Sequence, residues 1–341
     1  MLKNLTHLVS LTNSTNLSMQ MDFNLLIGVL LATSSSAFIG ASFIIKKKGL
    51  LKVSRNSELR AGRGGYAYLR EWLWWVGLIM MALGEAANFT AYAFAPPILV
   101  TPLGALSVIV TAILAAYFLN ECLNTIGKIG CLLCIVGSVV IILHAPGEGE
   151  LPNLHTVTTY IFSPLFLIYA ISAIIISLVL IIHIAPRYGN TNILVYISIC
   201  SLIGSLTVVM TKCLSVALRL TIEGDNQFGQ LTGWLFLLGM LVTLLTQMNY
   251  LNRALDMFNT SIVTPIYYVL FTSLTIIASA IFLREYQLIG LRDWVGIICG
   301  FGTIICGIFL LNTFKDLDLS KFKIVITKES LEQKKELLES I

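Results

Sequence analysis

Glu85 is the acidic residue that lies deepest within a long apolar stretch of the sequence. An ionised side chain inside a membrane costs about 2.5–3.5 kcal/mol on insertion scales, so such a residue is a functional candidate by default. Asn88 follows three residues later, and residues at this spacing share one helix face. Carboxylate and amide oxygens bind hard cations such as Mg²⁺, which retains several waters and needs only one or two carboxylates. Glu85 and Asn88 are therefore candidate metal ligands. In the alternative, Glu85 is structural: it pairs with a base, or it is protonated and hydrogen-bonded between helices.

A second polar group interrupts a later apolar stretch at Thr246, Gln247 and Asn249. Asn249 corresponds to Asn88 in the internal repeat described below, and the other two residues fall near the position of Glu85. These five residues are the predicted substrate path. The asparagines taken singly are equally compatible with hydrogen bonds between helices. The sequence offers no catalytic pair: no two histidines have metal-site spacing, and no glycine-rich segment ends in Gly-Lys-Ser or Gly-Lys-Thr. We therefore predict neither an enzyme nor a bound cofactor.

The composition places these residues in a membrane. Hydrophobic residues make up 57% of the 341 residues and charged residues only 12%, against about 25% charged in an ordinary soluble domain. The charges are also clustered, with 10 between Lys46 and Glu71 and 12 between Lys315 and Glu339. This pattern excludes a soluble enzyme, a disordered chain and a nucleic-acid-binding protein. It predicts an all-α polytopic membrane protein that lies in the lipid bilayer.

Nine stretches are long enough to cross the hydrocarbon core, which needs roughly 20 apolar residues. They lie at about 24–45, 72–95, 98–119, 126–144, 160–185, 192–215, 231–251, 262–283 and 293–312. The chain then divides into an N-terminal segment (1–23), a first set of spans (24–145), an unmatched fifth helix (160–185), a second set (192–312) and a tail (313–341). Lys46, Lys47 and Lys48 are interpreted as the solvated flank of the first span.

The distribution of lysine and arginine predicts the orientation. Eight basic residues lie between Lys46 and Arg70, whereas the connections near Pro96 and between His144 and Tyr160 carry none. Because basic loops stay in the cytoplasm, the N-terminus is predicted outside and the tail inside. Three glycosylation sequons, at Asn4, Asn13 and Asn16, fall in the predicted external segment.

The two sets of spans resemble each other. Val100-Thr101-Pro102 recurs as Val263-Thr264-Pro265, and Phe118-Leu119-Asn120-Glu121 recurs as Phe282-Leu283-Arg284-Glu285. Spans one to four thus match spans six to nine, and the odd offset of five spans inverts their direction in the membrane. An inverted repeat is typical of secondary transporters, which bind substrate near the midplane between the halves.

Three shorter motifs have plainer interpretations. The segment from Arg60 to Gly65 predicts a flexible basic loop that touches anionic lipid rather than a phosphate cradle. Pro102 and Pro265 are predicted to begin their helices, although a proline further inside would free a carbonyl that could line a pathway. Cys131-x-x-Cys134 lies in an apolar run, which favours helix packing over a redox or zinc pair.

Several longer strings resemble the NIPA and NIPA-like magnesium transporters. They are Arg60-Ala61-Gly62, Gly64-Gly65-Tyr66, Leu73-Trp74-Trp75, Gly84-Glu85, Asn88-Phe89, Ala91 to Pro96, Leu99 to Val108 and His144-Ala145-Pro146. The resemblance implies the drug/metabolite transporter fold with its tenth helix missing. It also implies Mg²⁺ movement at the plasma membrane and early endosomes, driven by membrane potential rather than ATP.

The leading hypothesis is a transporter of Mg²⁺ or another divalent cation that works by alternating access. A transporter of a small polar metabolite keeps the same fold and changes the substrate. A non-transporting scaffold or receptor, in which Glu85 is structural, comes from a different class. A homodimer is compatible with all three hypotheses.

Overall fold

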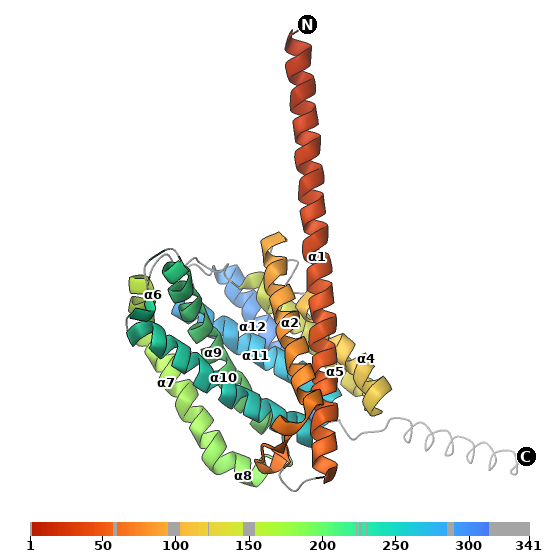
Figure 1. Cartoon of the computed structure of the whole chain (residues 1–341). Helices are drawn as coiled ribbons and strands as arrows, with labels where there is room; N and C mark the ends of the chain where they lie inside the picture. Colours follow the sequence, from red (N-terminus) through yellow and green to blue (C-terminus); the bar gives the residue numbers. More distant parts are fainter. Residues whose placement is uncertain are drawn as a thin grey trace, which may run out of the picture.

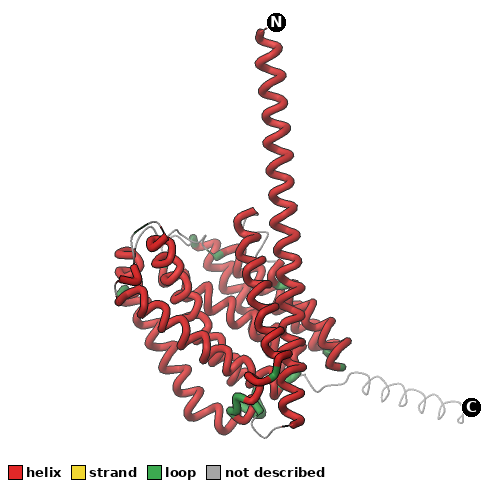
Figure 2. Tube along the Cα trace, in the orientation of Figure 1, coloured by secondary structure: helices red, strands yellow, loops and turns green. Residues whose placement is uncertain are grey.

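The computed structural model of the chain is a bundle of α-helices, and the part that it describes contains no strand (Figure 2). It describes residues 2–56, 60–94, 103–121, 123–145, 154–222, 224, 227–229, 231–284 and 290–313, with the side chains of the first helix from Leu26 onward. Eight described helices are long and apolar enough to cross a membrane. A ninth apolar helix, α4 (Leu106–Leu119), is shorter in its described part. The predicted all-α polytopic membrane fold is thus confirmed.

The long helices fall where the apolar stretches predicted spans. Besides α4, they are α1 (Leu2–Asn56), α2 (Trp72–Phe94), α5 (Thr125–His144), α7 (Pro164–Val179), α9 (Ile193–Ile222), α10 (Leu231–Met257), α11 (Thr260–Phe282) and α12 (Leu291–Thr313). Short helical segments connect them: η1 (Ala61–Arg63), η2 (Ala67–Arg70), α6 (Leu154–Ile161), η3 (Leu180–Ile184), α8 (Ala185–Tyr188) and η4 (Gln227–Gly229).

Helix α1 is much longer than the predicted first span. It continues without a break through Lys46, Lys47 and Lys48 to Asn56. The interpretation of these lysines as a solvated flank is wrong for Lys46 and Lys47, because both side chains are buried against other helices. At its other end α1 projects out of the bundle (Figure 1). The three sequon asparagines lie on this helical backbone, and their glycosylation remains a prediction.

The helices pair in two similar groups (Figure 1). In the first group α1 packs along α2 and α4, and in the second group α9 packs along α10 and α11. Helices α5 and α12 pack against each other, while α7 lies on α9 and α11. Under the predicted repeat α1, α2, α4 and α5 correspond to α9, α10, α11 and α12. The recurring partners are what such a repeat requires, and the repeat itself stays a prediction.

Glycines allow the closest helix pairs to approach. A Cβ atom on Gly130 would lie 2.9 Å from the carbonyl oxygen of Gly307, and one on Gly137 would lie 2.8 Å from that of Gly300. These contacts bring the backbones of α5 and α12 together, as small residues do between membrane helices. Cys134 is buried in this interface, against Gly307. Helix packing therefore explains the Cys-x-x-Cys spacing.

Pro265 lies inside α11 rather than at its start. The helix begins at Thr260, where the side chain of Asn259 caps it by accepting a hydrogen bond from the N–H of Ser261. The predicted helix start is therefore wrong at Pro265, and Pro102 lies outside the described residues. Because proline has no N–H, the carbonyl of Ser261 loses its usual donor within the helix.

Candidate functional site

Lys46 of α1 is fully buried inside the bundle. Its stem packs where Gly77 of α2 has no side chain, and its Nζ lies 2.8 Å from the sulfur of Met81. Met81 and Glu85 are four residues apart and therefore neighbours on one face of α2. The lysine thus runs along α2 toward the carboxylate; the charges of Lys46 and Glu85 influence each other without a direct ion pair.

Glu85 stands about 20 Å along α2 from Trp72, slightly past the middle of the helix. Its side chain is exposed at the surface of the chain, and its charge also acts on Tyr267 of α11. Tyr267 is buried, accepts a hydrogen bond of 3.1 Å from Gln247 Nε2 of α10, and packs edge-on against Phe43 of α1.

These interactions involve residues from five helices. We call Lys46, Glu85, Cys200, Gln247 and Tyr267 the central cluster. Cys200 of α9 is fully buried and lies near both Lys46 and Tyr267. The cluster brings α1 and α2 of the first group together with α9, α10 and α11 of the second. Polar side chains from both groups of helices therefore lie near one carboxylate.

Only some of the five predicted path residues lie together in the structure. Glu85 and Gln247 belong to the central cluster. Asn88 is half-buried, and its Oδ1 atom is buried with no hydrogen-bond partner among the described residues. Thr246 donates its hydroxyl to the carbonyl of Val242 within its own helix. Asn249 is half-buried, and it cannot share a helix face with Gln247 because residues two apart point in different directions.

A second polar assembly surrounds the end of α10. Asp256, near the C-terminus of that helix, has a fully buried side chain. Its Oδ2 atom lies 2.9 Å from Nε of Arg60 and accepts a 2.8 Å hydrogen bond from the N–H of Gly62. Ala61 and Gly62 are buried in this contact. The prediction of a flexible loop from Arg60 to Gly65 is therefore wrong: the loop is docked onto a carboxylate.

Lys47 holds the adjacent turn between α10 and α11. It donates hydrogen bonds to the carbonyls of Leu255 and Phe258, and its Nζ lies 3.9 Å from a carboxylate oxygen of Glu121. The other carboxylate oxygen of Glu121 accepts a 2.6 Å hydrogen bond from the N–H of Thr260, the first residue of α11. A cation at a helix C-terminus and an anion at a helix N-terminus both oppose the partial charges of those ends.

We call Lys47, Arg60, Gly62 and Glu121, together with the α10–α11 turn that they hold, the corner clamp. All four residues come from the first group of helices and its loop, whereas the turn belongs to the second group. The sequence did not predict the roles of Lys46, Lys47 and Asp256. The available signal was helical continuity: Lys46 and Lys47 extend the first helix past residue 45, and Asp256 lies just before residue 257. Only this continuity could have indicated that the three side chains face the bundle.

The described residues contain no group of three or more histidine, cysteine or acidic side chains that could hold a metal ion. Glu85 is the only carboxylate in the central cluster. A divalent cation bound there would take its remaining ligands from water, amides and hydroxyls. Such a site suits Mg²⁺, which retains its waters and binds through one or two carboxylates.

The chain is similar to known proteins over most of its length. Residues 23–317 match the family described as magnesium transporter NIPA. The chain is 52% identical over 317 residues to "Magnesium transporter NIPA3" of Pongo abelii, which covers 92% of this chain and 77% of the relative. It is 53% identical over 298 residues to the Homo sapiens protein of that name, covering 87% and 73%.

A plant relative is equally similar. "Probable magnesium transporter NIPA3" of Arabidopsis thaliana is 53% identical over 290 residues, which cover 85% of this chain and 78% of the relative. No solved structure shows significant similarity to the chain. The family is one of transporters and not of enzymes. With a match over most of its length and relatives at about half identity, this chain belongs to the magnesium transporter NIPA family.

Proposed function

We propose that this protein moves Mg²⁺ across a membrane through the central cluster, with Glu85 as the charged ligand. The observation that carries the proposal is a carboxylate whose charge acts on a fully buried lysine where the two groups of helices join. The names of its relatives as magnesium transporters support the choice of ion.

Lys46 gives the site a way to exchange charge. Without an ion, the ammonium of Lys46 balances the carboxylate of Glu85. A divalent cation that approaches Glu85 competes with this tethered cation, and repulsion drives the ammonium away from the carboxylate. The buried Oδ1 atom of Asn88, one turn from Glu85 on α2, supplies an oxygen that has no described partner. Retained waters complete the shell, as Mg²⁺ requires.

The corner clamp supports alternating access. It ties the two groups of helices together at one end of the bundle through largely buried charged contacts. We infer that the clamp keeps this end closed while the central cluster is reached from the other end. The clamp must then break before an ion can leave at the clamp end. By the lysine and arginine distribution the clamp end is cytoplasmic and the N-terminus is external.

The proposed driving force is the membrane potential, which acts on a divalent cation at about 2.3 kcal/mol per elementary charge per 100 mV. No nucleotide is required. The proposed locations are the plasma membrane and early endosomes, as the resemblance to the family implies.

The test is Mg²⁺ flux into proteoliposomes with an imposed potential, for the full chain and for Glu85→Gln. Because Glu85→Gln removes the one charged ligand, we expect at least about a tenfold loss of flux per reconstituted protein, typical of a lost charged contact. Asp293→Asn is the matched control, since it neutralises a half-buried acid in the first turn of α12, outside the central cluster, and should leave flux unchanged.

Full flux through the Glu85→Gln protein would refute the proposed ligand. If the wild-type protein carries a small polar metabolite independently of divalent cations, the substrate is that metabolite and not Mg²⁺. A wild-type protein that moves nothing across the sealed bilayer would indicate a scaffold or receptor instead.

A further inference from the structure

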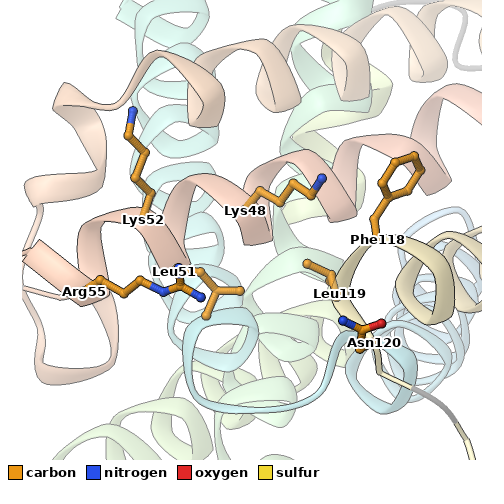
Figure 3. A pocket seen from close by; sticks show the side chains of 7 residues that line it. All are labelled: Lys48, Leu51, Lys52, Arg55, Phe118, Leu119 and Asn120. Carbon is orange, nitrogen blue, oxygen red and sulfur yellow. The ribbon is translucent and has the colours of Figure 1, made fainter.

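A basic pocket of about 480 Å³ lies beside the C-terminal ends of α1 and α4 (Figure 3). Its lining from α1 is Lys48, Leu51, Lys52 and Arg55, and its lining from α4 is Phe118, Leu119 and Asn120. The three cations are spaced at four and three residues, so they share one face of α1. The described residues that line the pocket include three cations and no carboxylate.

One of these cations is already neutralised. Lys52 Nζ lies 2.8 Å from a carboxylate oxygen of Glu71, and Figure 3 shows its side chain directed away from Asn120. Lys48 lies over the ring of Phe118, with Nζ 4.5 Å from the ring centroid. That contact orients the ammonium and leaves its charge in place. Lys48 and Arg55 therefore give the pocket a positive potential that favours an anion.

The surroundings of the pocket point to an amphiphile. An apolar face of α4 leads along the helix to the pocket and is exposed at Ile109 (44%), Ile113 (63%) and Tyr117 (79%). These residues recur every four positions, so they form one broad stripe that would contact lipid chains. Phe118, itself half exposed, connects the stripe to the cations. Acyl chains can therefore lie on α4 while a charged headgroup fills the pocket.

We propose that this pocket binds the phosphate-bearing headgroup of an anionic lipid. Basic pockets between membrane helices at the cytoplasmic surface are suited to such headgroups. The charge distribution of the chain predicts that this end is cytoplasmic. Free phosphate or a soluble phosphorylated metabolite shares the headgroup chemistry and lacks the chains that the α4 stripe would hold.

The experiment titrates the purified full chain in neutral detergent with dioctanoyl phosphatidylinositol 4,5-bisphosphate and measures the bound lipid by native mass spectrometry. The pocket variant combines Lys48→Gln with Arg55→Gln and leaves the Lys52–Glu71 pair intact. We expect its affinity to fall about 30-fold, because each Lys or Arg near an anionic surface contributes about fivefold. The charge-conserving pair Lys48→Arg with Arg55→Lys should retain most of the binding.

The matched control combines Arg63→Gln with Arg70→Gln, two exposed cations outside the pocket. This control also removes two charges and should bind the lipid like the wild type. Unchanged binding by the pocket variant, or an equal loss in the control, would refute the site. A thermal unfolding midpoint equal to that of the wild type ensures that the pocket variant is folded.

Two further probes identify the source of the anion. Dioctanoyl phosphatidylcholine should bind much more weakly, since it has no net charge. Inositol trisphosphate and inorganic phosphate carry the charge without chains, and we expect them to bind at least tenfold more weakly than the lipid. Equal affinity for inositol trisphosphate and the lipid would refute the lipid assignment. Equal affinity for the neutral and anionic lipids would refute the anion site.

Discussion

At the scale of single residues, the central finding is the position of Lys46. A lysine at this distance from the predicted end of a span normally extends its ammonium to water. Here the absence of a side chain at Gly77 lets the lysine stem enter the bundle, and the ammonium reaches Met81 next to Glu85. A buried cation is tolerated only with a partner, because the cost of removing it from water is large. Glu85 therefore acts as the counter-charge of Lys46 as well as the proposed ligand.

This pairing predicts that the effects of changing the two residues depend on each other. Lys46→Met and Glu85→Gln each leave one charge without its partner, so each should lower the free energy of unfolding. The double variant removes both charges and should be more stable than the sum of the single effects predicts, by about 0.5–3 kcal/mol, the range for residues that belong to one polar network.

Thermal unfolding of the detergent-solubilised full chain in the wild type and the three variants measures this coupling. Lys48→Met serves as the control, because Lys48 lies two residues further along α1 and contacts Phe118 rather than the central cluster. Strictly additive effects of Lys46→Met and Glu85→Gln would contradict the pairing.

At the scale of helices, glycine positions decide which helices can approach. Gly300 and Gly302 lie two residues apart on α12 and have opposite surroundings. A Cβ on Gly300 would lie 2.6 Å from the side chain of Ile141 and 2.9 Å from the carbonyl oxygen of Gly137, whereas one on Gly302 would meet nothing within 4 Å. The same substitution should therefore have opposite effects at these two positions.

Gly300→Ala should destabilise the protein by about 1–3 kcal/mol, because it forces the backbones of α5 and α12 apart. Gly302→Ala should be neutral or stabilising by up to about 1 kcal/mol, because alanine favours a helix more than glycine does. Thermal unfolding of both variants measures the difference. Equal destabilisation at the two positions would show that close packing of α5 on α12 is unimportant.

At the scale of the whole molecule, the corner clamp joins the two groups of helices. Asp256 is a buried acid near a helix C-terminus, where a negative charge is unfavourable by itself. Arg60 and the N–H of Gly62 compensate for this cost, so the loop after α1 and the end of α10 depend on each other. Loss of the Asp256 charge should loosen the contact between the groups.

We expect Asp256→Asn to open the clamp end and expose the central cluster. Cys200 reports on this change, because it is fully buried in the central cluster of the closed structure. A water-soluble maleimide should modify Cys200 about tenfold faster in the variant, as a contact worth about 1.4 kcal/mol would give, measured by mass spectrometry of the full chain in lipid. Asp293→Asn should leave the rate unchanged.

Cys213 distinguishes local opening from general loosening. It lies on the same helix, is equally buried and belongs to a different apolar cluster. Its modification rate should not change in Asp256→Asn. A parallel increase at Cys213, or an unchanged rate at Cys200, would contradict the proposed clamp.

Much of the architecture followed from the sequence. The spans of α2, α5, α11 and α12 begin and end within about three residues of the predicted positions, because a membrane helix must be apolar over a fixed length. Glu85 could be identified as a candidate for the same reason: an acid inside an apolar stretch is costly. The family resemblance rested on strings long enough to be specific, and the comparisons confirmed it.

The sequence by itself determined that the chain is a multi-helix membrane protein, and it predicted Glu85 as the candidate acid. Only the tertiary structure decided which side chains lie near Glu85. Hydropathy depends on how apolar each segment is, and by that measure Lys46, Lys47 and Asp256 mark the ends of spans. Their burial depends on charges contributed by other segments of the chain: Glu121 and Arg60 form ion pairs with Lys47 and Asp256, and the charge of Glu85 acts on Lys46. A charge becomes tolerable in the interior only when folding brings its partner to it, and no local pattern records that partner.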